Sequence, residues 1–283
     1  MQFNHLEIYP TDNCKLKCYG CILHARKRSL SERHIEKIVK SGILKRVRKS
    51  VTILGGEPTM WKKLLMFIPI CRRENKHIDI VIVSNGLNWN RKLVETCKKN
   101  RVLVDLSYHG IDISRTVGYL KKNRILRKII FVPSKYNYKT IDDDFRLYSS
   151  LTNCVYRPFI GGKDMAREVE LYNKVLKDVE YFRPVESSIR RINDENLSNI
   201  DIINKCARKP DFLSKFMCRC GKHGVIYTDG KLYHCLSDAM KGINYLPMTQ
   251  KNDFRLWKRC RNEVCSCDTF NLKTGTICMS NFL

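Results

Sequence analysis

The chain has 283 residues, of which 43% are hydrophobic, so it can bury the core of one large domain or of a medium domain with a smaller one attached. No run of about 18 apolar residues occurs, which excludes a predicted membrane span. The first residues lack the basic-then-apolar pattern of a signal peptide. We therefore expect a cytoplasmic protein without a membrane partner.

The chain is strongly basic. Lys and Arg number 53 against 28 for Asp and Glu, which gives a formal net charge of +25. Such a surface attracts anions, so we expect an anionic substrate or partner, with nucleotides and nucleic acids as the preferred candidates. A solvated basic surface without a partner is the alternative.

Fourteen cysteines are unusual for a cytoplasmic chain. Disulfides are rare in reducing compartments, so clustered cysteines there indicate metal binding or catalysis. Scattered cysteines are more simply interpreted as small buried hydrophobes, and these are Cys71, Cys97, Cys154 and Cys206. The other ten fall within residues 14–21 and 218–278, and thiolates grouped in this way favour iron–sulfur or zinc sites.

Short apolar runs alternate with amphipathic stretches along the first part of the chain. The apolar runs predict buried strands over 3–9, 50–54, 78–83, 101–107, 127–132 and 153–159. The amphipathic stretches predict helices over 31–45, 61–73, 90–100, 112–123, 141–151 and 164–182. Asn90 and Asp112 are expected to cap two of these helices.

Strict strand–helix alternation predicts a parallel sheet with right-handed crossovers. The predicted units are fewer than the roughly eight of a closed barrel, so the expected fold is α/β, a partial (β/α)6 TIM barrel. Its ligands should bind at the carboxyl ends of the strands.

The predicted barrel domain covers residues 1–183 and is followed by a polar connector over 184–217. Residues 218–283 then form a small cysteine-rich domain. Within it, residues 225–235 predict a hairpin around an Asp229-Gly230 turn.

The first cysteine group follows the first predicted strand. Cys14, Cys18 and Cys21 lie on one short loop, so they can ligate three irons of a cubane and leave the fourth iron open to a ligand. A structural zinc ion, with His24 as its fourth ligand, is the alternative.

Further signals follow the next strands in order. They are Gly55-Gly56-Glu57-Pro58 after the second strand, Ser84-Asn85-Gly86 after the third, Ser107 on the fourth and Arg157 on the sixth. Together with the Cys-x3-Cys-x2-Cys loop, this order resembles the radical S-adenosylmethionine (AdoMet) superfamily. The match covers about the first 180 residues.

The resemblance implies a [4Fe–4S] cluster on Cys14, Cys18 and Cys21 that cleaves AdoMet reductively. The resulting 5′-deoxyadenosyl radical takes a hydrogen atom from the substrate, and a reducing partner such as flavodoxin or ferredoxin supplies the electron. The family pattern places AdoMet against residues 55–57, 84–85, 107 and 157. No residue is assigned to catalysis on the substrate itself.

Two of the proposed AdoMet contacts have a simpler interpretation. Glu57 can be an acid at a helix N-terminus, favoured by the helix dipole, and Ser107 can be a buried strand hydroxyl. The chain also departs from the family pattern. The family has an aromatic residue directly before the third cysteine, but here that position is Gly20 and the aromatic residue is Tyr19. In the turn after the fourth strand, His109 stands in place of the usual Asp.

The second cysteine group opens with Cys220-x9-Gly230-x4-Cys235, which resembles the start of SPASM and Twitch domains. These domains hold auxiliary [4Fe–4S] clusters, and the short length here favours the one-cluster Twitch type. The expected ligands are Cys220, Cys235, Cys265 and Cys267, with Cys218 and Cys260 in reserve. A zinc site with His223 or His234 is the alternative.

Several activities fit these features. The preferred one is a radical AdoMet enzyme with an anionic, nucleotide-related substrate. A peptide-modifying maturase and a sugar-alcohol dehydrogenase are alternatives of the same chemistry. A zinc-containing nucleic-acid-binding protein without catalysis is an alternative of another class.

Overall fold

The structure is a computed structural model of the whole chain. It describes residues 3–16, 18, 21, 23, 27–132, 137, 139–156, 223–233, 235–242, 245–246 and 248. It also describes the backbone of short strands at 190–192, 195–197, 217–218, 258–259 and 278–279. Arg157, the predicted helix over 164–182 and most of the connector lie outside the described residues.

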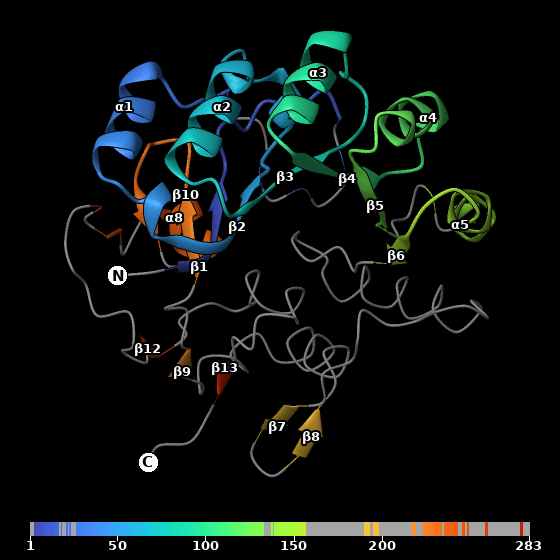
Figure 1. Cartoon of the computed structure of the whole chain (residues 1–283). Coiled ribbons are helices and arrows are strands. Elements are labelled where there is room, and N and C mark those ends of the chain that lie inside the picture. Colours follow the sequence, from blue (N-terminus) through green and yellow to red (C-terminus); the bar gives the residue numbers. More distant parts are fainter. Residues whose placement is uncertain are drawn as a thin grey trace.

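The main sheet has eight strands in the order β11-β10-β1-β2-β3-β4-β5-β6 (Figure 1). Its first six strands in the chain are β1 (Phe3–Ile8), β2 (Val47–Ile53), β3 (Asp79–Ser84), β4 (Val102–Tyr108), β5 (Leu126–Phe131) and β6 (Cys154–Tyr156). Each of these strands pairs in parallel with the next. The predicted α/β fold with a partial parallel barrel is confirmed.

Helices separate the strands and follow one another along the sheet (Figure 1). They are α1 (Glu32–Lys40), α2 (Leu64–Glu74), α3 (Arg91–Lys99), α4 (Ser114–Lys122) and α5 (Ile141–Ser149), with short 3-10 turns η1 (Leu44–Arg46) and η2 (Pro58–Met60). Since the hydrophobic periodicity predicted each of these helices, the local pattern and the tertiary packing agree.

One of the two predicted helix caps is wrong. Asn90 caps α3 as expected, because its side chain accepts a hydrogen bond from the backbone N–H of Leu93 at 2.9 Å. Asp112 does not cap α4, which has Ile113 at its N-cap position and no side-chain cap. The Asp112 carboxylate instead accepts from the N–H of Ser114 at 2.8 Å, which closes a turn just before the helix.

The core lies between the helices and one face of the sheet. Alternate strand residues such as Ile8, Ile53, Ile82, Leu106 and Phe131 are fully buried in it. Side chains alternate along a strand, so the other face carries a different set, which includes His5, Glu7, Thr52, Asp105 and Ser107. The barrel interior is therefore polar at several levels.

The scattered cysteines mostly behave as small hydrophobes. Cys71 and Cys97 are fully buried in the core, as predicted, and Cys154 is half-buried against it. Cys206 lies outside the described residues.

The C-terminal part of the chain extends the barrel sheet. Strand β10 (His223–Ile226) pairs in parallel with β1, and β11 (Leu232–Tyr233) pairs antiparallel with β10. The predicted Asp229-Gly230 turn joins them, with Gly230 at φ +69°, and helix α8 (Leu236–Lys241) follows. The first strand of the barrel thus has a neighbour on each side.

Short strands lie outside the main sheet. β7 (Arg190–Ile192) and β8 (Glu195–Leu197) form an antiparallel pair. A small sheet has the order β12 (Lys258–Arg259), β9 (Met217–Cys218) and β13 (Cys278–Met279).

Within the described part of the chain, no helix has the length and apolar character needed to cross a bilayer.

Replacing Gly224 with Ala is expected to destabilise the protein by about 1–3 kcal/mol because the added Cβ has no space. That atom would lie 2.9 Å from Phe3 Cε1 and 3.2 Å from Leu6 Cδ1, and both side chains are fully buried. Urea unfolding monitored by circular dichroism measures the change in the free energy of unfolding.

Gly118→Ala is the matched control. Gly118 lies in α4, and its added Cβ would have no heavy atom within 4 Å. Alanine is the better helix former, so this variant should gain about 0.5–1 kcal/mol. Equal stability of the two variants would contradict the close contact between β10 and β1.

Candidate functional site

The loop that carries the three N-terminal cysteines leaves the sheet directly after β1, and hydrogen bonds join its two ends. Thr11 and Ser29 form an antiparallel bridge, and their hydroxyls lie 2.7 Å apart. The N–H of Asp12 donates to the carbonyl of Arg28 at 3.1 Å, and the N–H of Arg28 donates to Asp12 Oδ1 at 2.6 Å. These reciprocal bonds fix both ends of the cysteine loop at one edge of the sheet.

The three thiols share a partly desolvated environment. Cys14, Cys18 and Cys21 are all half-buried, and the N–H of Cys21 donates to the carbonyl of Cys18 at 3.2 Å. Burial raises the pKa of all three thiols, and together with the neighbouring Cys21 and Cys14 thiols it raises that of Cys18 to about 11. Neutral thiols are therefore favoured until a positively charged centre displaces their protons.

The number and type of these donors fit an iron–sulfur cluster with one open iron. Three thiols near enough to influence one another match the ligand number of a cubane with one open iron. No three His, Cys, Asp or Glu side chains among the described residues are grouped as one metal ion would require. His24, the fourth ligand of the zinc alternative, lies outside the described residues, as do Tyr19 and Gly20.

The Gly-Gly-Glu segment lies against the strand that leads into the cysteine loop. The N–H of Gly56 donates to the carbonyl of Thr11 at 2.9 Å, and the N–H of Glu57 donates to the carbonyl of Asn13 at 2.7 Å. A Cβ on Gly55 would lie 2.6 Å from the Thr11 carbonyl oxygen, and one on Gly56 would lie 2.4 Å from that of Asn13. Only glycine allows the two backbones to come this close.

The Glu57 side chain is directed into the protein. It is fully buried, and Oε1 accepts from the Thr59 N–H at 3.1 Å, the Thr59 hydroxyl at 2.6 Å and the Ser84 hydroxyl at 2.8 Å. Oε2 accepts from the Asn85 N–H at 2.8 Å. Burial raises the pKa of this carboxyl, whereas the four hydrogen bonds favour its charged form.

Glu57 also has a structural role, which the sequence allowed beside a contact with AdoMet. Its side chain caps η2 and ties the segment after β2 to the end of β3.

Ser84 and Asn85 lie together at the carboxyl end of β3. The Ser84 hydroxyl donates to Glu57 and accepts from Trp89 Nε1 at 3.1 Å. Asn85 Nδ2 donates to Cys14 Sγ at 3.6 Å. The predicted site residues 14, 55–57, 84 and 85 thus form one connected group.

The other predicted AdoMet contacts are placed less fully. Ser107 is half-buried near the carboxyl end of β4, on the face opposite the helices. His109 lies two residues later, and burial lowers the pKa of this imidazole to about 4, so it is neutral at neutral pH. Arg157 lies outside the described residues.

Only part of the predicted auxiliary site is described. Cys235 is buried at the N-cap of α8, where its sulfur accepts from the Asp238 N–H at 3.5 Å. Cys218 is paired in register with Cys278 across β9 and β13, a proximity that the spacing of the cysteines did not reveal. Cys220, Cys260, Cys265, Cys267 and His234 lie outside the described residues, as does the side chain of His223.

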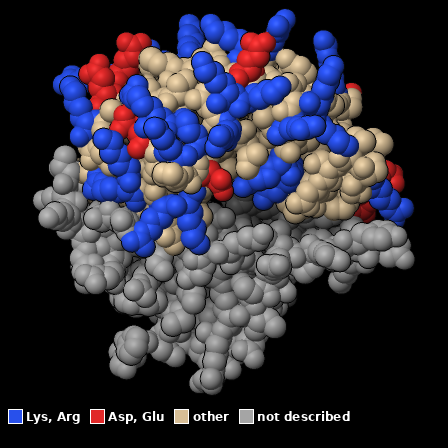
Figure 2. All heavy atoms as spheres, in the orientation of Figure 1, with Lys and Arg blue, Asp and Glu red and all other residues tan. Residues whose placement is uncertain are grey.

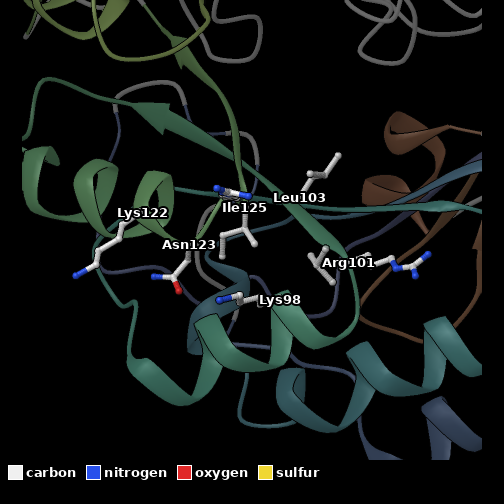
Figure 3. Close-up of a pocket in the computed structure, with 8 residues that line it drawn as sticks. Lys98, Arg101, Leu103, Lys122, Asn123 and Ile125 are labelled. Atoms are coloured by element: carbon white, nitrogen blue, oxygen red, sulfur yellow. The ribbon is translucent and has the colours of Figure 1, made fainter.

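A hollow of about 410 Å³ lies at the amino ends of β4 and β5, opposite to the strand ends that carry the cysteine loop (Figure 3). Its charged lining is wholly basic, with Lys98, Arg101, Lys122 and Arg124. In Figure 3, Arg101 and Lys122 extend away on opposite sides. Cations gather at helix C-termini because the helix dipole favours them there, so this lining needs no ligand to explain it.

On the face shown in Figure 2, basic side chains outnumber acidic ones. In Figure 2, Lys and Arg are spread over the helical face of the described part, and Asp and Glu are fewer. Several cations belong to the last turns of helices, including Lys37, Lys40, Lys98, Lys121 and Lys122. The excess of positive charge is therefore distributed over the helices and is not confined to the strand ends.

Gly56→Ala is expected to displace the segment before Cys14, because the new Cβ would contact backbone atoms that cannot rotate away. Iron and sulfide bound after anaerobic reconstitution should fall well below the wild-type amount. Gly118→Ala serves as the control and should bind iron normally. Full iron binding by Gly56→Ala would show that the close contact at the cysteine loop is dispensable.

Glu57→Gln should lower the free energy of unfolding by about 1–3 kcal/mol, because an amide group would face at least one N–H donor without an acceptor. Thermal or urea unfolding of the protein without cofactors measures this cost. Glu95→Gln is the control, because Glu95 is exposed on α3 and, among the described residues, forms an ion pair with Arg91 alone at the surface. A loss no larger than that of the control would contradict the buried network.

Comparison with known proteins supports the resemblance to the radical AdoMet superfamily. Residues 8–137 match the Radical SAM superfamily. The chain is 27% identical to the probable GTP 3′,8-cyclase of Sulfurisphaera tokodaii, over 89% of this chain and 86% of that protein. It is 22% identical to the GTP 3′,8-cyclase of Corynebacterium glutamicum, but over only 42% of this chain and 34% of that relative.

Solved structures share the fold. SuiB of Streptococcus suis aligns with a TM-score of 0.60 and 18% identity, over 93% of this chain and 67% of SuiB. The enzyme anSMEcpe, with bound AdoMet and a peptide, aligns with a TM-score of 0.60 and 15% identity, over 88% of this chain and 78% of that one. The solved structures thus share the parallel barrel fold, and the match over residues 8–137 assigns that part of the chain to the radical SAM superfamily.

Proposed function

We propose that Cys14, Cys18 and Cys21 hold a [4Fe–4S] cluster at which AdoMet is cleaved, and that the substrate is a purine nucleoside triphosphate. The observation that carries the first part is the connected group of Cys14, Gly55-Gly56-Glu57 and Ser84-Asn85 at adjacent strand ends. When bound, the cluster and AdoMet supply one-electron cleavage and a 5′-deoxyadenosyl radical, and the protein supplies position and exclusion of water.

The chain's own residues have distinct tasks in this scheme. The hydrogen bonds between Asp12 and Arg28 hold the two ends of the cysteine loop together. The close backbone contact with Gly55 and Gly56 positions the first residues of that loop. The partly buried thiols lie where water is restricted, which protects a reactive intermediate. Ser107 and Arg157 are also proposed to contact AdoMet.

The substrate class rests on two supports. The relative from Sulfurisphaera tokodaii aligns over most of both chains and is named for GTP. The net charge of +25 also favours a highly charged anion. Some solved neighbours are bound to a peptide, but those proteins share only 15–18% identity with this chain, so they show the fold alone.

The C-terminal region is proposed to carry one auxiliary cluster, with residues 1–183 as the barrel, 184–217 as the connector and 218–283 as the cysteine-rich domain. Cys235 is proposed as a ligand together with Cys220, Cys265 and Cys267, and Cys218 and Cys260 remain reserves. An iron–sulfur enzyme of this kind needs a low-potential electron donor, for which flavodoxin or ferredoxin is proposed. A reducing cytoplasm is the proposed compartment, because it keeps the free thiols available.

The test is 5′-deoxyadenosine formation by the anaerobically reconstituted protein with AdoMet, a strong reductant and GTP. The wild type should form 5′-deoxyadenosine, and GTP should increase its rate and be consumed. Cys18→Ala should abolish formation, whereas Cys97→Ala should retain it, because Cys97 is buried in the core on α3.

The results separate the parts of the proposal. Iron-loaded protein that forms 5′-deoxyadenosine without any response to GTP would reject the nucleotide and leave the cleavage chemistry. Equal 5′-deoxyadenosine formation by wild type and Cys18→Ala would reject the assigned cluster ligands.

A further inference from the structure

Asn85 makes a contact that the family comparison does not assign. Its side-chain Nδ2 donates to Cys14 Sγ at 3.6 Å, within range of a hydrogen bond to sulfur. The two residues are 71 positions apart in the chain, and Asn85 is only 7% exposed. The sulfur of the first cysteine therefore lies against a fixed donor from the end of β3.

The orientation of this carboxamide follows from its other partner. Asn85 Oδ1 accepts from the backbone N–H of Leu87 at 3.1 Å. A backbone N–H can only donate, so the oxygen must face Leu87 and the NH₂ group must face Cys14. The donor to the sulfur is thus set by the turn after β3.

The backbone of Asn85 is anchored as well. Its N–H donates to Glu57 Oε2 at 2.8 Å, and Glu57 is itself held by Thr59 and Ser84. Asn85 therefore donates to a buried carboxylate through its backbone and to a cysteine sulfur through its side chain. The negative charge of Glu57 opposes negative charge on Cys14, and the Asn85 side chain counteracts it.

We propose that Asn85 is a positioning residue that fixes Cys14 Sγ and raises the reduction potential of the cluster that Cys14 helps to hold. The inference rests on the proposed function in that it takes Cys14 as a cluster ligand. An N–H donor stabilises negative charge on sulfur, and reduction of the cluster adds one electron. The reduced state gains more from the donor than the oxidised state, so the cluster is easier to reduce.

Two variants separate the donor from the rest of the side chain. Asn85→Asp retains an oxygen for the Leu87 N–H but removes the donor to sulfur and adds a negative charge. Asn85→Leu removes the donor without adding charge. Asn88→Leu is the control, because it makes the same change three residues further along, where Nδ2 is buried without a hydrogen-bond partner in the described structure.

The measurement is a redox titration monitored by electron paramagnetic resonance, on protein with its iron and sulfide content determined. The signal that is absent from Cys18→Ala identifies the N-terminal cluster. At a fixed potential, the ratio of reduced to oxidised cluster should fall about tenfold in Asn85→Leu, which corresponds to about 59 mV for a one-electron couple. Asn85→Asp should fall further because of its charge, and Asn88→Leu should match the wild type.

A wild-type potential in iron-loaded Asn85→Leu or Asn85→Asp would overturn the proposal. So would an equal shift in Asn88→Leu, because the effect would then belong to the turn and not to the sulfur contact. If wild-type protein lacks a signal that depends on Cys18, the proposed cluster assignment fails instead, and the role of Asn85 fails with it. The two failures are therefore distinguishable.

Discussion

The site depends on one close contact between two backbones. The segment Thr11–Asn13, which leads from β1 into the cysteine loop, lies against Gly55 and Gly56 after β2 at a distance that leaves no space for a Cβ on either glycine. Because β1 and β2 are adjacent parallel strands, the sheet itself brings these segments to one edge. The position of the first cysteine therefore depends on the pairing of β1 with β2 and on the absence of side chains at Gly55 and Gly56.

A buried charge connects this contact to the third strand. Glu57 pairs with no cation in the described structure and is stabilised by hydroxyl and N–H donors from Thr59, Ser84 and Asn85. Such an arrangement is costly if any donor is lost, because the remaining group would be desolvated without compensation. The same network ends at Cys14, so the rigidity of the fold and the environment of the sulfur have a common cause.

The sequence predicted the barrel well because its signals are local. Apolar runs and helical periodicity located the first five strands and helices, and Asn90 capped α3 as expected. Asp112 failed as a cap because α4 begins one residue later than the pattern suggested. The order of the cysteine loop and of residues 55–57 and 84–85 identified the site, but the inward direction of Glu57 and the bond from Asn85 to Cys14 depend on tertiary packing between distant segments.

The pairing of β10 with β1 has a consequence for biosynthesis. The carbonyl of Ile226 accepts a hydrogen bond from the N–H of Tyr9, two residues before Thr11, where the cysteine loop begins. A ribosome makes the N-terminal strand first, so β1 has an unpaired edge until more than 220 residues have been synthesised. A nascent or truncated chain would therefore expose a strand edge beside three free thiols. Pairing of the C-terminal hairpin with β1 covers this edge and so protects the site from association with other chains.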